Sequence, residues 1–434
     1  MYKTKNNFKS GKRSFGGRGS FQKRRGSQNH GSRGRGPKPS YIDESKLINR
    51  AEVETVTEAY VPTHTFNDFA VDERIKQNLS RSGFVTPTPI QDQTIPHALK
   101  GRDVVGIANT GTGKTLAFIL PLLDKALKNP REKMLIVAPT RELAQQIEAE
   151  LFKFTKGLNI FSVVGVGGLP IYKQISFLKR GYTFVIGTPG RLMDLRDRKA
   201  LDFSKFNTVV LDEADRMLDM GFIKDIESML KEMPANRQTL FFSATMSREI
   251  EALIGRFLKD HVTVSVKTRE TSKTIDQDVV RINGGASKLE TLAEMLIKEE
   301  FEKVLIFGKT KRGVEDLSRS LVAKGFKSES VHGDKAQSQR QRSLLAFKRN
   351  NVQILVATDV AARGLDIPNV SHVINFDMPA TYEDYVHRIG RTGRGGKTGK
   401  ALTFVEERAP RHSQGDRPKR QFTPQRHAAN RYSR

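Results

Sequence analysis

The sequence predicts an α/β protein with two similar domains in tandem, each a parallel sheet with helices on both faces, between two basic tails. A chain of 434 residues is usually too long to fold around a single hydrophobic core, so two domains are expected. Short apolar runs alternate with helical stretches in two series, which is the pattern of parallel sheets. Residues 1–40 contain 12 Lys and Arg and no acid, and residues 408–434 contain 8 and one acid, so these tails carry +19 of the net charge of +26.

Both tails are predicted to lack regular structure, because they contain too little apolar surface to offset the entropy of ordering them. The run from Phe15 to Gly19 (Phe-Gly-Gly-Arg-Gly) resembles arginine-glycine segments that contact single strands, with a solvated linker as the alternative. The charge indicates a polyanionic partner, and nucleic acid fits best. A role in solubility alone is the other interpretation.

The composition excludes several classes of protein. Because there is no cysteine, disulfides and cysteine-ligated metals are excluded, and a reducing compartment is compatible with the sequence. No apolar run reaches the roughly 18 residues that a membrane span needs. The basic N-terminus lacks the apolar stretch of a secretory signal. We therefore expect a soluble, cytoplasmic protein with no membrane partner, and the sequence leaves its oligomeric state open.

The first domain is predicted over residues 66–266, after an N-terminal extension at 41–65. Apolar residues at 143, 147, 151 and 154 repeat with a period near 3.6, as one buried helix face requires. Five short apolar runs are predicted to be buried strands: Val104–Ile107, Met134–Ala138, Phe184–Ile186, Val209–Leu211 and Thr239–Phe242.

A polar stretch at residues 267–278 predicts an interdomain linker, and the second domain is expected over 279–407. Val314, Leu317 and Leu321 form a predicted helix face, and Gly325 suits the C-terminal end of that helix. The predicted strands of this domain are Val304–Phe307, Val352–Ala357, Val373–Phe376 and Ala401–Val405.

The segment after the Val104–Ile107 run has the form of a phosphate-binding loop. It precedes an apolar run suited to a helix, whose N-terminus favours anions. Lys114 can reach the β- and γ-phosphates, and the Thr115 hydroxyl can ligand Mg²⁺. An ordinary glycine-rich turn is the alternative, and the strand-to-helix context disfavours it. The predicted phosphate-binding residues are Thr110, Gly111, Thr112, Gly113, Lys114 and Thr115.

An acidic tetrad, Asp212-Glu213-Ala214-Asp215, directly follows the Val209–Leu211 run. A buried strand that ends in carboxylates suits the second half of a nucleoside-triphosphate site. Asp212 can hold Mg²⁺ through water, and Glu213 can orient and deprotonate the attacking water. The alternative is a solvated acidic surface, which is what most acidic clusters are. The phosphate-binding loop upstream favours a nucleotide site instead.

These motifs together resemble the DEAD-box ATP-dependent RNA helicases from about Phe66 to Val405, in the order that the family shows. The resemblance implies two RecA-like domains. The segment Gly-Phe-Val-Thr-Pro-Thr-Pro-Ile-Gln at 83–91 resembles the Q motif of the family, in which Gln91 and the upstream Phe66 would read and stack on adenine. Asn109 stands where the family more often has Gln, which leaves phosphate binding to the backbone and Lys114.

The resemblance also implies roles beyond the nucleotide. Ser243 and Thr245 would couple hydrolysis to strand separation. Asp366 would face the nucleotide, and Arg391 and Arg394 would be arginine fingers on the γ-phosphate. The residues that would contact the RNA backbone are Thr140, Arg141, Gly167, Gly168, Thr188, Arg191, Gln337, Arg340, Thr358 and Asp359.

The implied function is an ATP- and Mg²⁺-dependent enzyme that separates RNA duplexes locally or remodels RNA–protein complexes, with little sequence preference. Its catalytic residues would be Lys114, Asp212, Glu213, Arg391 and Arg394. An RNA-dependent ATPase that clamps or anneals RNA with little unwinding would carry the same motifs. A non-enzymatic RNA-binding protein and a DNA helicase are further alternatives, and both are disfavoured by the motif set.

Overall fold

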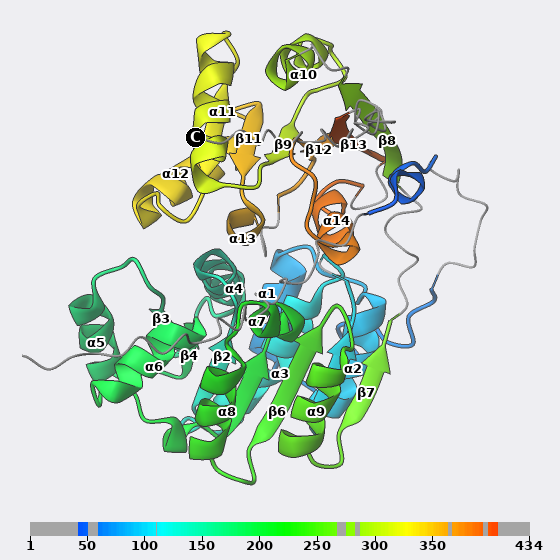
Figure 1. Ribbon diagram of the computed structural model, residues 1–434. Helices are drawn as coiled ribbons and strands as arrows, with labels where there is room; N and C mark the ends of the chain where they lie inside the picture. Colours follow the sequence, from blue (N-terminus) through cyan, green and yellow to red (C-terminus); the bar gives the residue numbers. More distant parts are fainter. Residues whose placement is uncertain are drawn as a thin grey trace, which may run out of the picture. The chain divides into compact units, whose positions relative to one another are not determined.

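The computed structural model describes residues 42–50, 60–109, 111–266, 275–282, 287–362, 367–393 and 398–406 (Figure 1). The predictions for the tails at 1–40 and 408–434 therefore lie outside the described residues. Below, the first lobe means the described residues from 60 to 266, and the second lobe means those from 275 to 406. None of the described helices is both long and apolar enough to cross a membrane.

The first lobe is built on a seven-stranded sheet in which every neighbouring pair of strands is parallel, with the order β3-β4-β2-β5-β6-β1-β7. Its central strands are buried along their whole length, which explains their continuous apolar sequences. The strands are β1 (Val104–Ile107), β2 (Met134–Val137), β3 (Ser162–Gly165), β4 (Phe184–Gly187), β5 (Thr208–Leu211), β6 (Gln238–Ser243) and β7 (Val262–Ser265).

Helices cover both faces of this sheet, as predicted. One face carries α1 (Glu73–Arg81), α2 (Pro89–Leu99), α3 (Lys114–Lys128) and α4 (Arg141–Phe154). The 3.6-residue repeat predicted for α4 is confirmed, because its four apolar residues are buried. The other face carries α5 (Ile171–Lys179), α6 (Pro189–Asp197), α7 (Ala214–Asp219), α8 (Ile223–Glu232) and α9 (Arg248–Phe257), with the 3₁₀ turn Phe203–Lys205.

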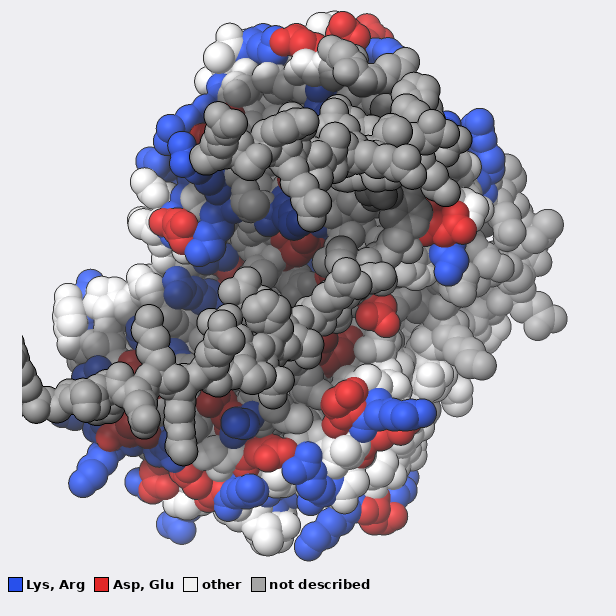
Figure 2. Space-filling view, in the orientation of Figure 1, with Lys and Arg blue, Asp and Glu red and all other residues white. Residues whose placement is uncertain are grey.

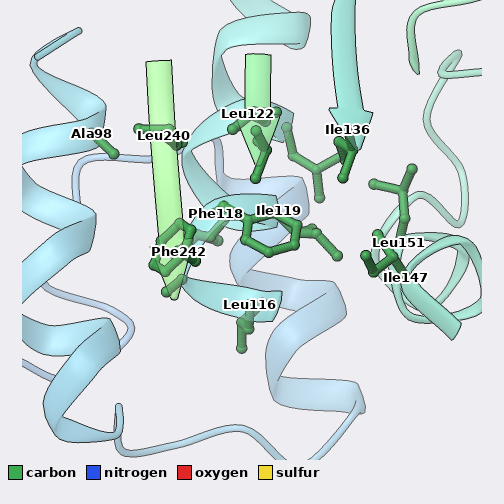
Figure 3. Packing of buried hydrophobic residues seen from close by; sticks show 14 of the residues in the cluster. Ala98, Leu116, Phe118, Ile119, Leu122, Ile136, Ile147, Leu151, Leu240 and Phe242 are labelled. Carbon is green, nitrogen blue, oxygen red and sulfur yellow. The ribbon is translucent and has the colours of Figure 1, made fainter. Parts of the chain in front are cut away.

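Helix α3 forms the centre of the first of these layers (Figure 3). Its side chains pack between strands β2 and β6 and helix α4, so the helix that starts at the phosphate-binding loop is held on several sides. On the opposite layer Arg256 of α9 and Glu227 of α8 form a partly exposed ion pair of 2.6 Å. Figure 2 shows blue and red side chains interspersed over that part of the surface.

The second lobe has a six-stranded, fully parallel sheet with the order β10-β11-β9-β12-β13-β8. Gly325 has a φ of +93° just after the end of α11, as predicted for a helix C-terminus. The strands are β8 (Ile275–Ile282), β9 (Val304–Phe307), β10 (Ser328–Val331), β11 (Ile354–Ala357), β12 (His372–Asn375) and β13 (Gly399–Glu406). The helices are α10 (Lys288–Leu296), α11 (Lys311–Ala323), α12 (Gln337–Lys348), α13 (Asp359–Ala362) and α14 (Tyr382–Ile389).

One predicted boundary is wrong. Residues 275–278, expected to end the linker 267–278, form the first half of β8, which pairs with β13 over eight residues. The exposed Asp278 made the segment look like a polar linker, although Ile275 and Gln277 are buried. Strands β3, β7 and β10 were not predicted, because each mixes small or polar residues with few apolar ones.

Candidate nucleotide and RNA site

The phosphate-binding loop joins the end of β1 to the start of α3. Gly113 has a φ of +95° and is the N-cap of α3, so the first N–H groups of the helix are open to an anion. The Lys114 Nζ donates to the Ala108 carbonyl over 2.9 Å, and the Thr112 hydroxyl donates to the Asn109 carbonyl over 2.8 Å. These two bonds tie side chains of the loop to backbone carbonyls at its start. Thr110 lies outside the described residues.

Gln91 connects the Q motif directly to this loop. Its Oε1 accepts from the backbone N–H of Thr88, and its Nε2 donates to the carbonyl of Gly113, each over 2.9 Å. A Cβ at position 113 would collide with the Gln91 amide, so that position requires glycine on steric as well as conformational grounds. The structure therefore brings two predicted nucleotide-binding segments together.

Phe66 is only 2% exposed and packs edge-on against Phe69 and Phe84. Its predicted stacking on adenine stays a prediction. The chain just ahead of it is fixed by Asp92, the residue after Gln91, whose buried carboxylate accepts from the Tyr60 hydroxyl at 2.6 Å and from the Thr63 N–H at 2.8 Å. Nothing in the sequence pattern singled out Asp92, because its partners lie about 30 residues away.

The acidic tetrad begins where β5 ends, as predicted. Asp212 and Glu213 are each 3% exposed. Burial raises the pKa of Asp212 to about 7; the positive charge of Lys114 opposes this rise, and the negative charge of Glu213 adds to it. Glu213 has a φ of +50°, an uncommon conformation for a residue with a side chain, and such strain concentrates at functional sites.

This environment fits a divalent cation. Asp212 and Glu213 are adjacent buried carboxylates, and a bound Mg²⁺ would relieve the cost of burying their negative charge. Asp212 would hold the cation, together with the hydroxyl of Thr115 at the start of α3. Within the described part of the chain, no group of three or more acidic or His side chains is placed to hold a metal ion.

Asp215, the last residue of the tetrad, is bonded to the segment after β6 and is not assigned to the cation site. Its Oδ2 accepts from the backbone N–H of Ala244 and of Thr245, each over 3.1 Å, and from the Thr245 hydroxyl over 3.3 Å. The Ser243 hydroxyl donates to the Thr245 carbonyl over 2.8 Å, and the Ser243 carbonyl accepts from the N–H of Ala108 over 3.0 Å. The predicted coupling residues are therefore bonded to both halves of the nucleotide site.

The predicted RNA-contacting residues of the first lobe also converge. A Cβ on Gly167 would lie 3.0 Å from the Arg141 guanidinium, so the two glycines at 167 and 168 let Arg141 lie against the backbone. Arg191 donates to the carbonyl of Leu169 over 3.1 Å. Thr140 and Thr188 are the N-caps of α4 and α6.

From the second lobe, Gln337 and Arg340 reach the same region through Glu142. The Arg340 Nη2 pairs with a Glu142 oxygen at 2.9 Å, and the Gln337 Nε2 donates to the other oxygen at 3.0 Å. A cavity of about 470 Å³ lies here. Met220 and Phe222 also line the cavity. The sequence did not predict them, because apolar residues just after α7 match no binding motif. The residues predicted to contact RNA that line this cavity are Thr140, Arg141, Gly167, Thr188, Arg191 and Arg340.

Asp359 is held by Arg388, and its predicted contact with RNA stays a prediction. The guanidinium of Arg388 donates to both carboxylate oxygens, at 2.6 and 2.8 Å, and also bonds the Asn375 side chain and the Asp377 carbonyl. Sequence reasoning gave Arg388 no role of its own. Thr358 and Arg391 are buried, and the Arg391 Nε donates to the His387 carbonyl over 3.3 Å. Asp366 and Arg394 lie outside the described residues.

Comparison with known proteins agrees with this geometry. The model of the DEAD/DEAH box helicase family matches residues 88–253, and that of the helicase conserved C-terminal domain matches 287–396. ATP-dependent RNA helicase CshA of Listeria monocytogenes is 47% identical over 345 residues. That match covers 79% of this chain and 66% of CshA, so the chain spans about two thirds of the length of this relative.

Solved structures extend the likeness to both lobes. S. cerevisiae Dbp5 bound to RNA and ADP BeF3 is 30% identical with a TM-score of 0.71, over 79% of this chain and 90% of that one. Mss116p bound to ssRNA and AMP-PNP is 31% identical with a TM-score of 0.72, over 83% of this chain and 78% of that one. With both halves matched by family models and the Q motif, phosphate loop and acidic tetrad assembled around one site, the chain belongs to the DEAD-box RNA helicase family.

Proposed function

We propose that this protein is an ATP-dependent RNA helicase that uses ATP hydrolysis to separate short RNA duplexes or to remodel RNA–protein complexes. The bonding of Asp215 to the Ser243–Thr245 segment carries this proposal, because it links the hydrolytic carboxylates to a segment outside the nucleotide site. The names of the relatives support it: CshA is an ATP-dependent RNA helicase, and the two solved proteins bind RNA with nucleotide analogues.

Hydrolysis is assigned to groups from both lobes. Gln91 and the loop at 111–115 hold ATP, with Lys114 on its β- and γ-phosphates. Mg²⁺ at Asp212 and Thr115 supplies charge neutralisation on the phosphates when it is bound. Glu213 orients the attacking water and takes its proton, and Arg391 neutralises the charge that develops on the transferred phosphoryl group. The proposed roles of Phe66, Asp366 and Arg394 complete this set.

RNA is proposed to lie across Thr140, Arg141, the two glycines at 167 and 168 and Arg191, and to reach Gln337, Arg340 and Thr358 on the second lobe. These hydroxyl, amide and guanidinium groups suit phosphate and ribose, so little sequence preference is expected. Contacts to 2′-hydroxyls would distinguish RNA from DNA. The basic tails would add salt-sensitive affinity. We propose a cytoplasmic location, where both ATP and RNA occur, and cell fractionation tests it.

The experiment is a duplex-separation assay beside an ATPase assay on the same preparation. A helicase releases the labelled strand of a short RNA duplex only with ATP, and RNA stimulates its phosphate release more than DNA of matching sequence does. Stimulated ATPase without strand release identifies an RNA-dependent clamp instead. Equal stimulation by DNA and RNA contradicts the proposed substrate.

A further inference from the structure

A short segment that precedes the first lobe in the sequence packs on the second lobe. Residues 42–49, which we call the brace, contain a 3₁₀ turn at Glu44–Leu47, capped by the side chain of Asp43. Leu47 is 0% exposed and Ile42 is 7% exposed. These two side chains complete a hydrophobic cluster whose other buried members all belong to the second lobe: Ile275, Tyr385, Ile389 and Ala401.

Polar contacts fix the brace in register. Asn49 and Gln277 form an antiparallel bridge, with N–H to carbonyl distances of 3.0 and 2.7 Å, at the outer strand β8. The Tyr385 hydroxyl is 2.9 Å from the Gln277 side-chain oxygen and 3.4 Å from the Leu47 carbonyl. Glu44 pairs with Arg281 at 3.6 Å. The brace therefore contacts β8 and α14 through backbone, apolar and charged groups together.

Helix α14 is the element that this contact reaches. Tyr385 and Ile389, its two residues in the cluster, are each 0% exposed. The helix ends at Ile389, and Arg391 follows two residues later, with its guanidinium bonded back to the His387 carbonyl. A shift of α14 would therefore move Arg391 with it. Arg388 of the same helix is held by Asp359, and the brace adds a further support to α14.

We propose that the brace is a positioning element for catalysis: by packing Leu47 and Ile42 against α14, it holds Arg391 where the γ-phosphate is hydrolysed. This inference rests on the proposed function, because it assumes that Arg391 acts in hydrolysis. Residues 42–49, which precede the first lobe in the sequence, would then act as a functional part of the second lobe. It also predicts that removing the brace slows the chemical step rather than nucleotide binding.

The test compares Leu47→Ala with Ile48→Ala in the full-length protein. The two residues are neighbours of equal size, but Leu47 is fully buried while Ile48 is 45% exposed. We expect Leu47→Ala to lower kcat at saturating RNA and ATP by about fivefold or more, with the affinity for ADP unchanged within about twofold. Affinity for ADP with beryllium fluoride should fall with kcat, because that complex fills the γ-phosphate position. Ile48→Ala should match the parent.

Two deletions give an independent measurement. Removing residues 1–41 deletes the basic tail but keeps the brace, whereas removing 1–50 deletes both. The 1–50 deletion should turn over as slowly as Leu47→Ala, and the 1–41 deletion should keep the parent kcat. Thermal unfolding followed by circular dichroism identifies an assay temperature at which every variant is folded. If Leu47→Ala is folded and keeps the parent kcat and fluoride-complex affinity, the inference is overturned.

Arg391→Gln in the 1–41 deletion separates this inference from the proposed function. Lost turnover there, with parent-like turnover in the folded Leu47→Ala protein, leaves the role of Arg391 intact and rejects only the brace. Turnover that survives Arg391→Gln rejects the assigned role of Arg391 and the inference with it. If the role of Arg391 and the role of the brace are both correct, the double variant should lose much less kcat, as a free energy, than the sum of the two single losses. The reason is that both substitutions act through the Arg391 guanidinium.

Discussion

The carboxylate of Asp215 accepts a hydrogen bond from the Thr245 hydroxyl over 3.3 Å and another from the Thr245 N–H over 3.1 Å. Asp215 is three residues from the buried Asp212, and Thr245 follows the end of β6. This contact makes the last residue of the acidic tetrad a link to another loop and not a metal ligand. The coupling of hydrolysis to RNA separation can pass through it.

We predict that Thr245→Val uncouples the two activities. The change removes the hydroxyl donor but keeps the size of the side chain and the backbone bond, and a hydrogen bond to a charged group contributes about 1.5–3 kcal/mol. Duplexes separated per ATP hydrolysed should fall by about tenfold, with RNA-stimulated phosphate release within about threefold of the parent.

Thr239→Val is the matched control, because Thr239 lies in β6, the strand that leads to Thr245, and its buried hydroxyl has no hydrogen-bond partner among the described residues. It should leave the number of duplexes separated per ATP unchanged. A Thr245→Val protein that unwinds with parental efficiency would show that the hydroxyl of Thr245 takes no part in coupling.

A second prediction concerns RNA affinity. Gly168 has a φ of +78°, and a Cβ there would run into the Arg141 guanidinium. Gly168→Ala should therefore displace Arg141 and weaken RNA binding by about tenfold, a loss of one charge-assisted contact. Gly157→Ala is the control, since its φ is also +78° but nothing lies within 4 Å of the added Cβ. Equal RNA affinities for the two variants, measured by fluorescence anisotropy, would argue against the role of Arg141.

A third prediction concerns stability in acid. Burial, together with the nearby positive charge of Lys400, lowers the pKa of His372 to about 4. Between about pH 4 and 6.5 the unfolded chain then binds a proton that the folded chain does not, so the free energy of unfolding falls as the pH falls through this window. His372→Phe keeps an aromatic ring against Phe301 and removes the titration. In urea unfolding of the second lobe, this variant should lose less stability on acidification than the parent; an identical loss would refute the assignment.

A fourth prediction concerns the N-terminal tail. Deleting residues 1–40 removes 12 basic residues and no acid, so RNA binding at moderate salt should weaken more than saturated turnover does. The dependence of the RNA affinity on salt concentration should also become shallower. An unaltered affinity and salt dependence would reduce the tail to a solubility element.

Much of the fold and the centre of the site could be predicted, because they depend on local patterns. The strands β1 and β9 and the buried face of α4 follow from continuous or periodic apolar residues. Lys114 could be placed because the phosphate-binding loop links β1 to its helix, and the acidic tetrad because it directly follows β5.

The contacts that the sequence did not reveal are those between residues far apart in the chain. Asp92 holds residues about 30 positions earlier, and Arg388 joins Asp359 to Asn375 by side-chain geometry alone. The brace was predicted only as an extension, since one 3₁₀ turn has no periodicity to read. Strand β8 resembled a linker because its buried residues alternate with polar ones at the edge of the sheet.

The central claim is that Glu213, held in a left-handed conformation beside the buried Asp212, orients and deprotonates the water that attacks ATP. Glu213→Gln keeps the size of the side chain and one acceptor oxygen but cannot accept that proton. The most direct measurement is RNA-stimulated phosphate release by this variant, with ATP and RNA binding measured alongside. We expect turnover to fall by about 10²–10⁴, with both affinities preserved. Phosphate release at the parental rate would contradict it.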